Sequence, residues 1–282
     1  MGIAQFVHDL TQYAFLQDAL FLSLTLGAGC GVVGCFIILR GLALMGDAIS
    51  HAVIPGVAIS YMLKVSYFLG AVVFGLFAAL AMGFIRERSK IKSDAAIGIV
   101  FSAFLALGIL LITKIQSSID LTNILFGNVL TVRSTERWLA YGAVASILSI
   151  IAIFYKELKL TTFDPVMAEV SGLPVRWINY GIILMLTTIT VVSLQTVGAI
   201  LVVAMLITPA STAYLLTQRF SSMLWLSAGL GVLSSLIGLY LSVTYNLPSG
   251  VVIVLTAATF FMAAFLLAPR DGVLWHLRKQ GG

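Results

Sequence analysis

Asp47 and His51 are the two residues of this sequence whose types and spacing best suit chemistry. They are four positions apart in the otherwise apolar stretch 46–56, with Ser50 beside them. On a helix this spacing places the carboxylate and the imidazole on one face, one turn apart. A carboxylate inside a membrane costs roughly 2.5–3.5 kcal/mol on insertion scales, so an acid at such a position indicates a function.

Three uses of this pair are compatible with the local residue pattern. As a metal site, a carboxylate oxygen and an imidazole nitrogen suit Mn²⁺, Zn²⁺ or Fe²⁺. As a proton relay, the same pair could serve a secondary transporter. As a structural ion pair, it would only tie two membrane spans together. An acid and a histidine four residues apart do not decide among the three.

The scarcity of other ionisable groups limits what one chain could bind. His8 lies in the N-terminal segment and His276 in a basic tail, and we expect both to be solvated. Two ligands are too few to hold a divalent ion selectively, whereas a twofold dimer would supply two carboxylates and two imidazoles. Met45 and Met205 could add soft contacts, although a methionine in a span is more often packing.

The composition predicts a membrane protein. The chain has 282 residues, of which 60% are hydrophobic and 10% charged, and its mean hydropathy is +1.09. Soluble domains are about 25% charged. We therefore expect an all-α, polytopic helical membrane protein with a single domain over 1–282. The net charge of +5 is what basic loops at a membrane produce, so it implies no nucleic-acid partner. Cys30 and Cys35 are expected to be packed thiols.

Nine apolar runs are each near the roughly 20 residues that a bilayer requires. Several abut closely, and Pro55 with Gly56 permits a bend in the second run, so eight spans are a rival count. The first 17 residues look amphipathic, and we expect them to lie at the membrane interface. The nine predicted spans are 18–40, 42–63, 66–85, 93–113, 135–155, 177–195, 197–217, 223–245 and 250–268.

The distribution of Lys and Arg predicts the orientation. If the spans alternate and the C-terminus is cytoplasmic, most basic residues fall in inner loops, as the positive-inside rule requires. This orientation places the N-terminus outside. The outer loops then hold only Lys64, Lys114, Arg133 and Arg137.

Two loops have features of their own. The segment 114–134 is too polar to span, and we expect a short helix on the outer face with Asp120 as its N-cap. In the cytoplasmic segment 156–176, Asp164 is a predicted N-cap with Pro165 at the first helical position. Gly172 and the following Pro174 predict the end of that helix, giving 165–172. Its residues alone suit a docking element and a plain connector equally.

Enzyme readings have little support in the sequence. It contains no phosphate-binding loop of the Gly-x-x-x-x-Gly-Lys-Ser/Thr type, so the chain cannot bind ATP in that way. It also lacks the His-Glu-x-x-His and Gly-x-Ser-x-Gly motifs. Metal-assisted hydrolysis by the Asp47–His51 pair would need further ligands.

Five ordered blocks, spread over nearly the whole length, match a known family. The chain resembles the membrane permeases of manganese, zinc and iron ABC importers, and it is most similar to the manganese-type members. The blocks are GDAISHA at 46–52, SDAAIGIVFS at 93–102, LFGN at 125–128, FDPVMAEVSGLP at 163–174 and VGAILVVAMLITPA at 197–210.

The resemblance implies a homodimeric permease in the bacterial cell membrane that moves a divalent ion, with Mn²⁺ favoured. Asp47 and His51 would be the metal ligands, and no cofactor would be bound permanently. A separate cytoplasmic ATPase would hydrolyse ATP, and an extracellular metal-binding protein would deliver the ion. The ATPase would dock on the coupling segment 163–174, through Asp164, Pro165, Ala168, Glu169 and Gly172.

Two rival functions remain open from the residues. One is an ion-coupled secondary metal transporter that works without an ATPase. The other is a metal enzyme embedded in the membrane, which would show turnover without translocation.

Overall fold

A computed structural model describes residues 3–115 and 132–268. Nine stretches within these residues are long and apolar enough to cross a membrane, which agrees with the larger of the two predicted counts. The helix predicted around Asp120, and His276, lie outside the described residues. The helices are α1 (Ile3–Gln12), α2 (Ala14–Leu39), α3 (Ala43–Ala52), α4 (Ile54–Leu63), α5 (Tyr67–Arg88), α6 (Ser93–Ile115), α8 (Ser134–Ile153), α9 (Tyr155–Phe163), α10 (Pro165–Val170), α11 (Val175–Val197), α12 (Ala199–Leu216), α13 (Phe220–Tyr245) and α14 (Ser249–Leu267).

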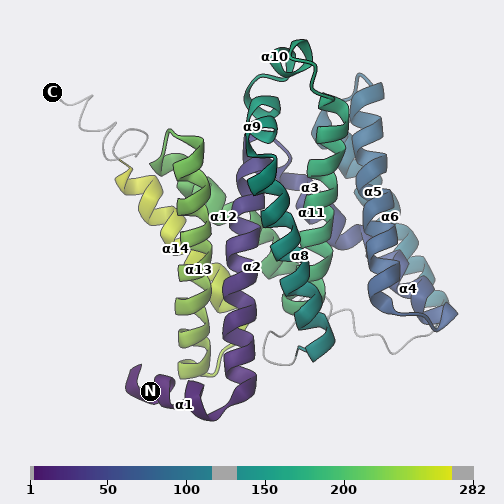
Figure 1. The fold of residues 1–282 in the computed structure, drawn as a ribbon. Helices are drawn as coiled ribbons and strands as arrows, with labels where there is room; N and C mark the ends of the chain where they lie inside the picture. Colours follow the sequence, from purple (N-terminus) through teal and green to yellow (C-terminus); the bar gives the residue numbers. More distant parts are fainter. Residues whose placement is uncertain (1–2, 116–131, 269–282) are drawn as a thin grey trace.

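The spans begin and end within a few residues of the predicted ranges. Each consists of a continuous apolar run, and a helix is the way such a run can pair all its backbone groups inside hydrocarbon. The first span begins earlier than predicted, at Ala14, so residues 14–17 belong to α2. The remaining N-terminal segment forms α1, which runs across the ends of α2 and α13 (Figure 1).

The second span is broken into two ten-residue helices, α3 and α4, at Val53. Pro55 lies in the first turn of α4 and has no N–H to donate to the carbonyl of His51, four residues earlier. The α-helical ladder is therefore interrupted just after the residue pair of interest. The helix is thus interrupted where the sequence permits a bend, and Pro55 is the cause of the interruption.

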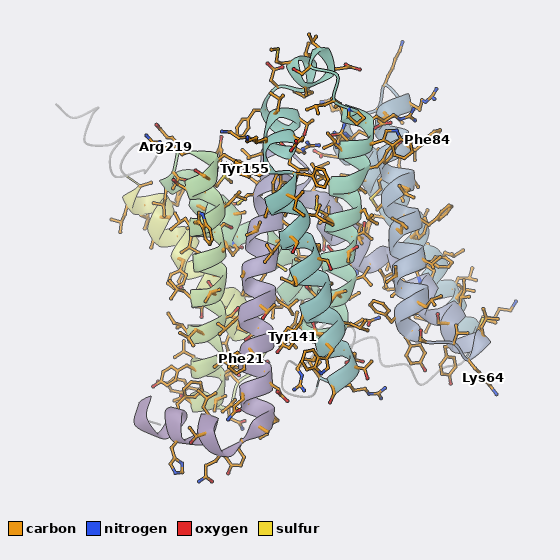
Figure 2. All side chains as sticks on the ribbon, in the orientation of Figure 1. Phe21, Lys64, Phe84, Tyr141, Tyr155 and Arg219 are labelled. Carbon is orange, nitrogen blue, oxygen red and sulfur yellow. The ribbon has the colours of Figure 1, made fainter. Side chains whose placement is uncertain are left out.

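The two ends of the bundle are distinct in Figure 1. The short helix α10 projects from one end, and α1 lies at the other. The last span, α14, finishes toward the α10 end, so the two ends of the described chain lie on opposite sides, as an odd number of crossings requires. In Figure 2, Arg219 lies at the α10 end and Lys64 at the far end. This separation agrees with the sides predicted for these two residues.

The helix α2 lies at the centre of the main packing unit, between α13, α12, α8 and α11. Small residues allow its backbone to meet that of α13. A Cβ added at Gly231 would overlap the carbonyl oxygen of Gly27, and a Cβ added at Gly27 would come within 2.6 Å of the Gly231 carbonyl oxygen. Close backbone approach through small residues is the usual way in which membrane helices associate.

The segment 156–176, predicted to be cytoplasmic, differs from its predicted structure in two ways. Residues 155–163 form the helix α9, which the sequence did not reveal. The following helix, α10, ends at Val170 and not at Gly172, because Gly172 has a φ of 80°. There the Leu173 N–H donates to the carbonyl of Ala168 and the Gly172 N–H to that of Glu169, which is the hydrogen-bond pattern of a Schellman motif.

Candidate metal site

Asp47 and His51 lie on the same face of α3, as their spacing predicts. The imidazole Nε2 is 3.6 Å from the carboxylate Oδ1. The His51 side chain is 25% exposed and that of Asp47 is 48% exposed. The two groups are therefore close enough to share an ion, and both remain open on one side within the single chain.

The opposite face of α3 is anchored in the bundle. Ile49 and Ala52 are fully buried, and the Ser50 hydroxyl donates to the carbonyl of Gly46 at 3.0 Å. Ser50 is thus occupied by its own helix and does not point a free hydroxyl at the pair. The imidazole packs in a T-shaped arrangement with the ring of Phe101 in α6, with the ring centroids 5.5 Å apart. Phe101 thus covers one side of the His51 ring.

The face that carries the pair extends to Leu44, which is 53% exposed. Leu44, Asp47 and His51 are three and four residues apart, so they form one stripe along α3. An acid facing lipid at such a position would be costly. The stripe therefore suits contact with another protein surface or with water better than contact with lipid.

One chain does not provide a complete metal site among the residues that the structure describes. No group of three or more His, Cys, Asp or Glu side chains comes together in 3–115 and 132–268. Met45 is buried in the core. Met205, the other methionine considered from the sequence, lines a different space with Cys30. The donor set at α3 is therefore one carboxylate and one imidazole.

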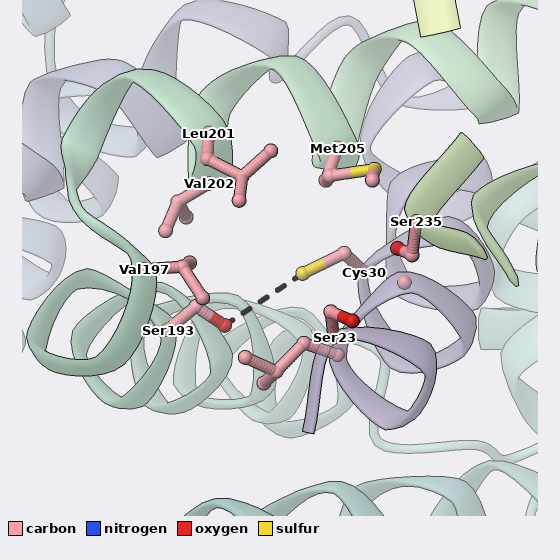
Figure 3. A pocket seen from close by; sticks show the side chains of 10 residues that line it. Ser23, Cys30, Ser193, Val197, Leu201, Val202, Met205 and Ser235 are labelled. Atoms are coloured by element: carbon pink, nitrogen blue, oxygen red, sulfur yellow. Dashed lines mark hydrogen bonds between the residues drawn. The ribbon is translucent and has the colours of Figure 1, made fainter. Parts of the chain in front are cut away.

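A small cavity of about 10 Å³ lies between α2, α11, α12 and α13 (Figure 3). Cys30 Sγ lies 3.7 Å from Ser193 Oγ, and Met205 also lines the cavity. Its lining contains no carboxylate or imidazole, so its donors do not suit Mn²⁺. Cys30 and Cys35 are both buried and free, which confirms the prediction of packed thiols.

The residues predicted to couple to an ATPase lie together on α10 and at its two ends. They are more than 100 residues after Asp47 and His51 in the sequence. Asp164 Oδ1 accepts from the Met167 N–H at 2.9 Å, which confirms the predicted N-cap. Ala168 is fully buried and faces the bundle, whereas Glu169 is exposed. The exposed apolar side chains of this helix are Val166, Met167 and Val170.

Sequence reasoning missed a polar cluster around Arg40, which it used only to mark the cytoplasmic end of the first span. Arg40 is the C-cap of α2, and its guanidinium donates to Thr161, Thr162 and Asn179. Burial, together with the positive charge of Arg86, lowers the pKa of Arg40 to about 10, so it stays protonated at neutral pH. No periodicity links residues that are more than 120 positions apart, so only the fold could reveal the cluster.

Comparison with known proteins places the chain among ABC transporters. Residues 12–268 match the family model described as the ABC 3 transport family. The chain belongs to this family. The nine candidate spans among the described residues and this membership make it a multi-pass protein of the bacterial plasma membrane and a transport subunit.

Curated members of the family are similar over almost their full length. The manganese transport system membrane protein MntC of Listeria innocua is 56% identical over 98% of this chain and 98% of its own. The manganese import system permease protein ScaB of Streptococcus gordonii is 48% identical over 96% of this chain and 98% of its own. A solved structure of PsaBC from Streptococcus pneumoniae in complex with Fab has a TM-score of 0.87 at 49% identity, covering 98% of this chain and 100% of that chain.

Proposed function

We propose that this chain is the membrane permease of an ATP-driven importer of divalent metal ions, with Mn²⁺ favoured. The observation that carries the proposal is the Asp47–His51 pair on α3, in a chain 56% identical to a manganese transport system membrane protein. A carboxylate oxygen and an imidazole nitrogen are ligands that suit Mn²⁺.

The pair is half of a site in this proposal. A twofold dimer that buries the Leu44–Asp47–His51 stripe would place two carboxylates and two imidazoles around one axis. The half-open side chains support this arrangement, because they leave a face of α3 for a second copy. The ion would bind at that dimer axis and be released on the other side of the membrane.

The energy for transport comes from a separate cytoplasmic ATPase. The exposed apolar residues of α10, together with the exposed charge of Glu169, form a short helical surface to which that ATPase can bind. The Asp164 cap and the Schellman motif hold the helix at both ends. The chain has no phosphate-binding loop of its own, so its ATP must be hydrolysed by another subunit. That subunit needs a surface of this chain on which to dock.

ATP-driven closure of the ATPase would push on α10 and shift the spans, so that the site opens to one face and then to the other. The two conformations must differ in affinity for the ion, or ATP would do no transport work. Zn²⁺ generally binds nitrogen and oxygen ligands more tightly than Mn²⁺. Selectivity must therefore come from geometry and from an extracellular protein that delivers the ion.

Uptake by vesicles tests the proposal. The chain is reconstituted with an ABC-type ATPase that co-purifies with it, and ⁵⁴Mn²⁺ uptake is measured with ATP, without ATP, and with a proton gradient alone. We expect uptake only when both the ATPase and ATP are present. Gradient-driven uptake by the chain alone would replace the proposal with a secondary transporter. The absence of uptake, with hydrolysis of a bound substrate, would indicate a metal enzyme.

A further inference from the structure

Arg40 lies at a junction between the metal-binding helix and the coupling segment. It is the C-cap residue of α2, and only Gly41 and Leu42 separate it from α3, which carries Asp47 and His51. Its side chain leaves this junction and contacts α9 and α11.

The guanidinium bonds to two helices at once. Arg40 Nη2 and Nε donate to Thr161 Oγ1 and Thr162 Oγ1 at 3.0 and 3.1 Å, both in the last turns of α9. Its Nη1 donates to Asn179 Oδ1 in α11. The planar fork of an arginine can hold several acceptors in fixed directions, which the single ammonium of a lysine cannot do.

Both threonine hydroxyls already donate their single proton to carbonyls of α9. Towards Arg40 they can therefore act only as hydrogen-bond acceptors. Thr162 donates to the carbonyl of Leu158 at 2.7 Å, and Thr161 donates to the carbonyl of Glu157 at 2.9 Å. Each oxygen is then free to accept from Arg40. The hydroxyls thus join the guanidinium to the backbone of α9.

The acceptors that hold Arg40 are neutral. Among the ion pairs of residues 3–115 and 132–268, none involves Arg40. Hydrogen bonds from a charged donor to neutral oxygens hold geometry without the strong attraction of a buried ion pair. Such a contact can move as a unit or re-form at moderate cost.

The helix α9 continues directly into α10. Its last residue, Phe163, is followed by Asp164, which caps α10. A displacement of α10 therefore reaches the last turn of α9, where Thr161 and Thr162 are located. The path from there to α3 runs through Arg40 and the Gly41 turn, in which Gly41 has a φ of 65°.

We propose that Arg40 is a positioning residue that transmits movement of the coupling helix α10 to the metal-binding helix α3. The inference rests on the proposed function, because it assumes that an ATPase moves α10. Arg40 touches neither metal nor nucleotide in this role. It holds the junction of α2 and α3 to the end of α9, so that the metal pair follows the ATPase.

Loss of the cluster should not unfold the protein. Aromatic packing also holds α9 at its first and last residues, with the rings of Tyr155 and Phe163 against Phe220 at centroid distances of 5.8 and 5.5 Å. The ring of Phe220 in turn packs against Phe36 of α2 at 5.2 Å. These contacts preserve the position of α9 when the hydrogen bonds are removed.

The test measures Mn²⁺ transported per ATP hydrolysed by the reconstituted complex. For Arg40→Gln we expect this ratio to fall about tenfold, within the usual range of coupling between sites. Mn²⁺ binding to the resting complex, co-purification of the ATPase and ATP hydrolysis should persist. Arg40→Lys should restore only part of the ratio, since it keeps the charge without the fork.

A second variant leaves Arg40 in place and removes its acceptors on α9. The double change Thr161→Val and Thr162→Val keeps side-chain size and should lower the same ratio. Thr188→Val is the matched control. Thr188 bonds to the carbonyl of Leu184 within α11 but does not contact Arg40, so its ratio should match the unaltered complex.

The outcomes separate the two proposals. If the unaltered complex shows no ATP-dependent Mn²⁺ uptake, the proposed function fails. If it transports Mn²⁺ and both Arg40→Gln and the double threonine variant keep the full ratio, the role of Arg40 is overturned. If hydrolysis, thermal stability and uptake all fall together in both variants, Arg40 is only structural and the inference is again wrong.

Discussion

The contact between α2 and α13 and the outer stripe of α3 are two opposite kinds of helix surface. Where α2 meets α13, Gly27 and Gly231 bring the backbones together, and the Ser227 hydroxyl donates to the carbonyl of Gly31 at 2.7 Å. On α3, the side chains of Asp47 and His51 stay partly exposed, although the His51 ring also packs against Phe101 of α6. The first surface is complete within one chain, and the second is not.

The difference shows how the protein divides support from function. A surface built from small residues has little side-chain entropy to lose and packs tightly, so it resists rearrangement. In the proposed function, the partly exposed Asp47 and His51 become fully paired only when an ion and further ligands bind. We therefore expect changes at the first surface to affect folding and changes at the second to affect transport.

The largest effect is expected from Gly231→Leu. Its side chain would overlap the α2 backbone at Gly27, which cannot move aside, so the variant should lose more than about 3 kcal/mol of stability. Size-exclusion chromatography of the detergent extract would show no folded peak. The control is Gly229→Leu on the same helix, where an added Cβ meets nothing within 4 Å. Equal yields of the two variants would contradict the close contact.

The next effect concerns the open stripe. His51→Ala should fold and assemble normally but lower Mn²⁺ uptake at trace metal by at least about 100-fold, since even outer-shell partners are worth 10–100-fold. Ser50→Ala is the control, because the Ser50 hydroxyl bonds only to its own helix at Gly46. Normal uptake by the His51 variant would remove the pair from the metal site.

A smaller effect is expected at the coupling helix. Glu169→Lys reverses an exposed charge on α10 and should lower uptake about fivefold while ATP hydrolysis continues. Lys64→Glu reverses an exposed charge at the opposite end of the bundle and should leave coupling unchanged (Figure 2). Unaltered coupling in the Glu169 variant would make α10 a plain connector.

The smallest effect is expected from Ser227→Ala. It removes one hydrogen bond between α13 and α2, worth about 0.6 kcal/mol on average between membrane helices. Equilibrium unfolding in mixed micelles would measure the change. Ser234→Ala, which loses only a bond to Leu230 within α13, should change stability less. A larger loss for Ser234 would show that the bond between helices contributes little.

The spans and the common helix face of Asp47 and His51 could be predicted from the sequence, because both depend on local order. Apolar runs of about 20 residues must pair their backbone groups inside a membrane, so they fold as helices wherever they lie in the chain. The spacing of Asp47 and His51 fixes a common helix face, and Pro55 fixes the break that follows. The Asp164 cap of α10 is equally local.

The tertiary structure decided which distant residues meet. Arg40 reaches Thr161, Thr162 and Asn179 because α2, α9 and α11 converge at one end of the bundle. The helix α9 also eluded sequence reasoning, since its mixed polar composition gives no clear apolar face. Contacts between residues so far apart in the sequence depend on the packing of all the spans together. No local sequence pattern records that packing.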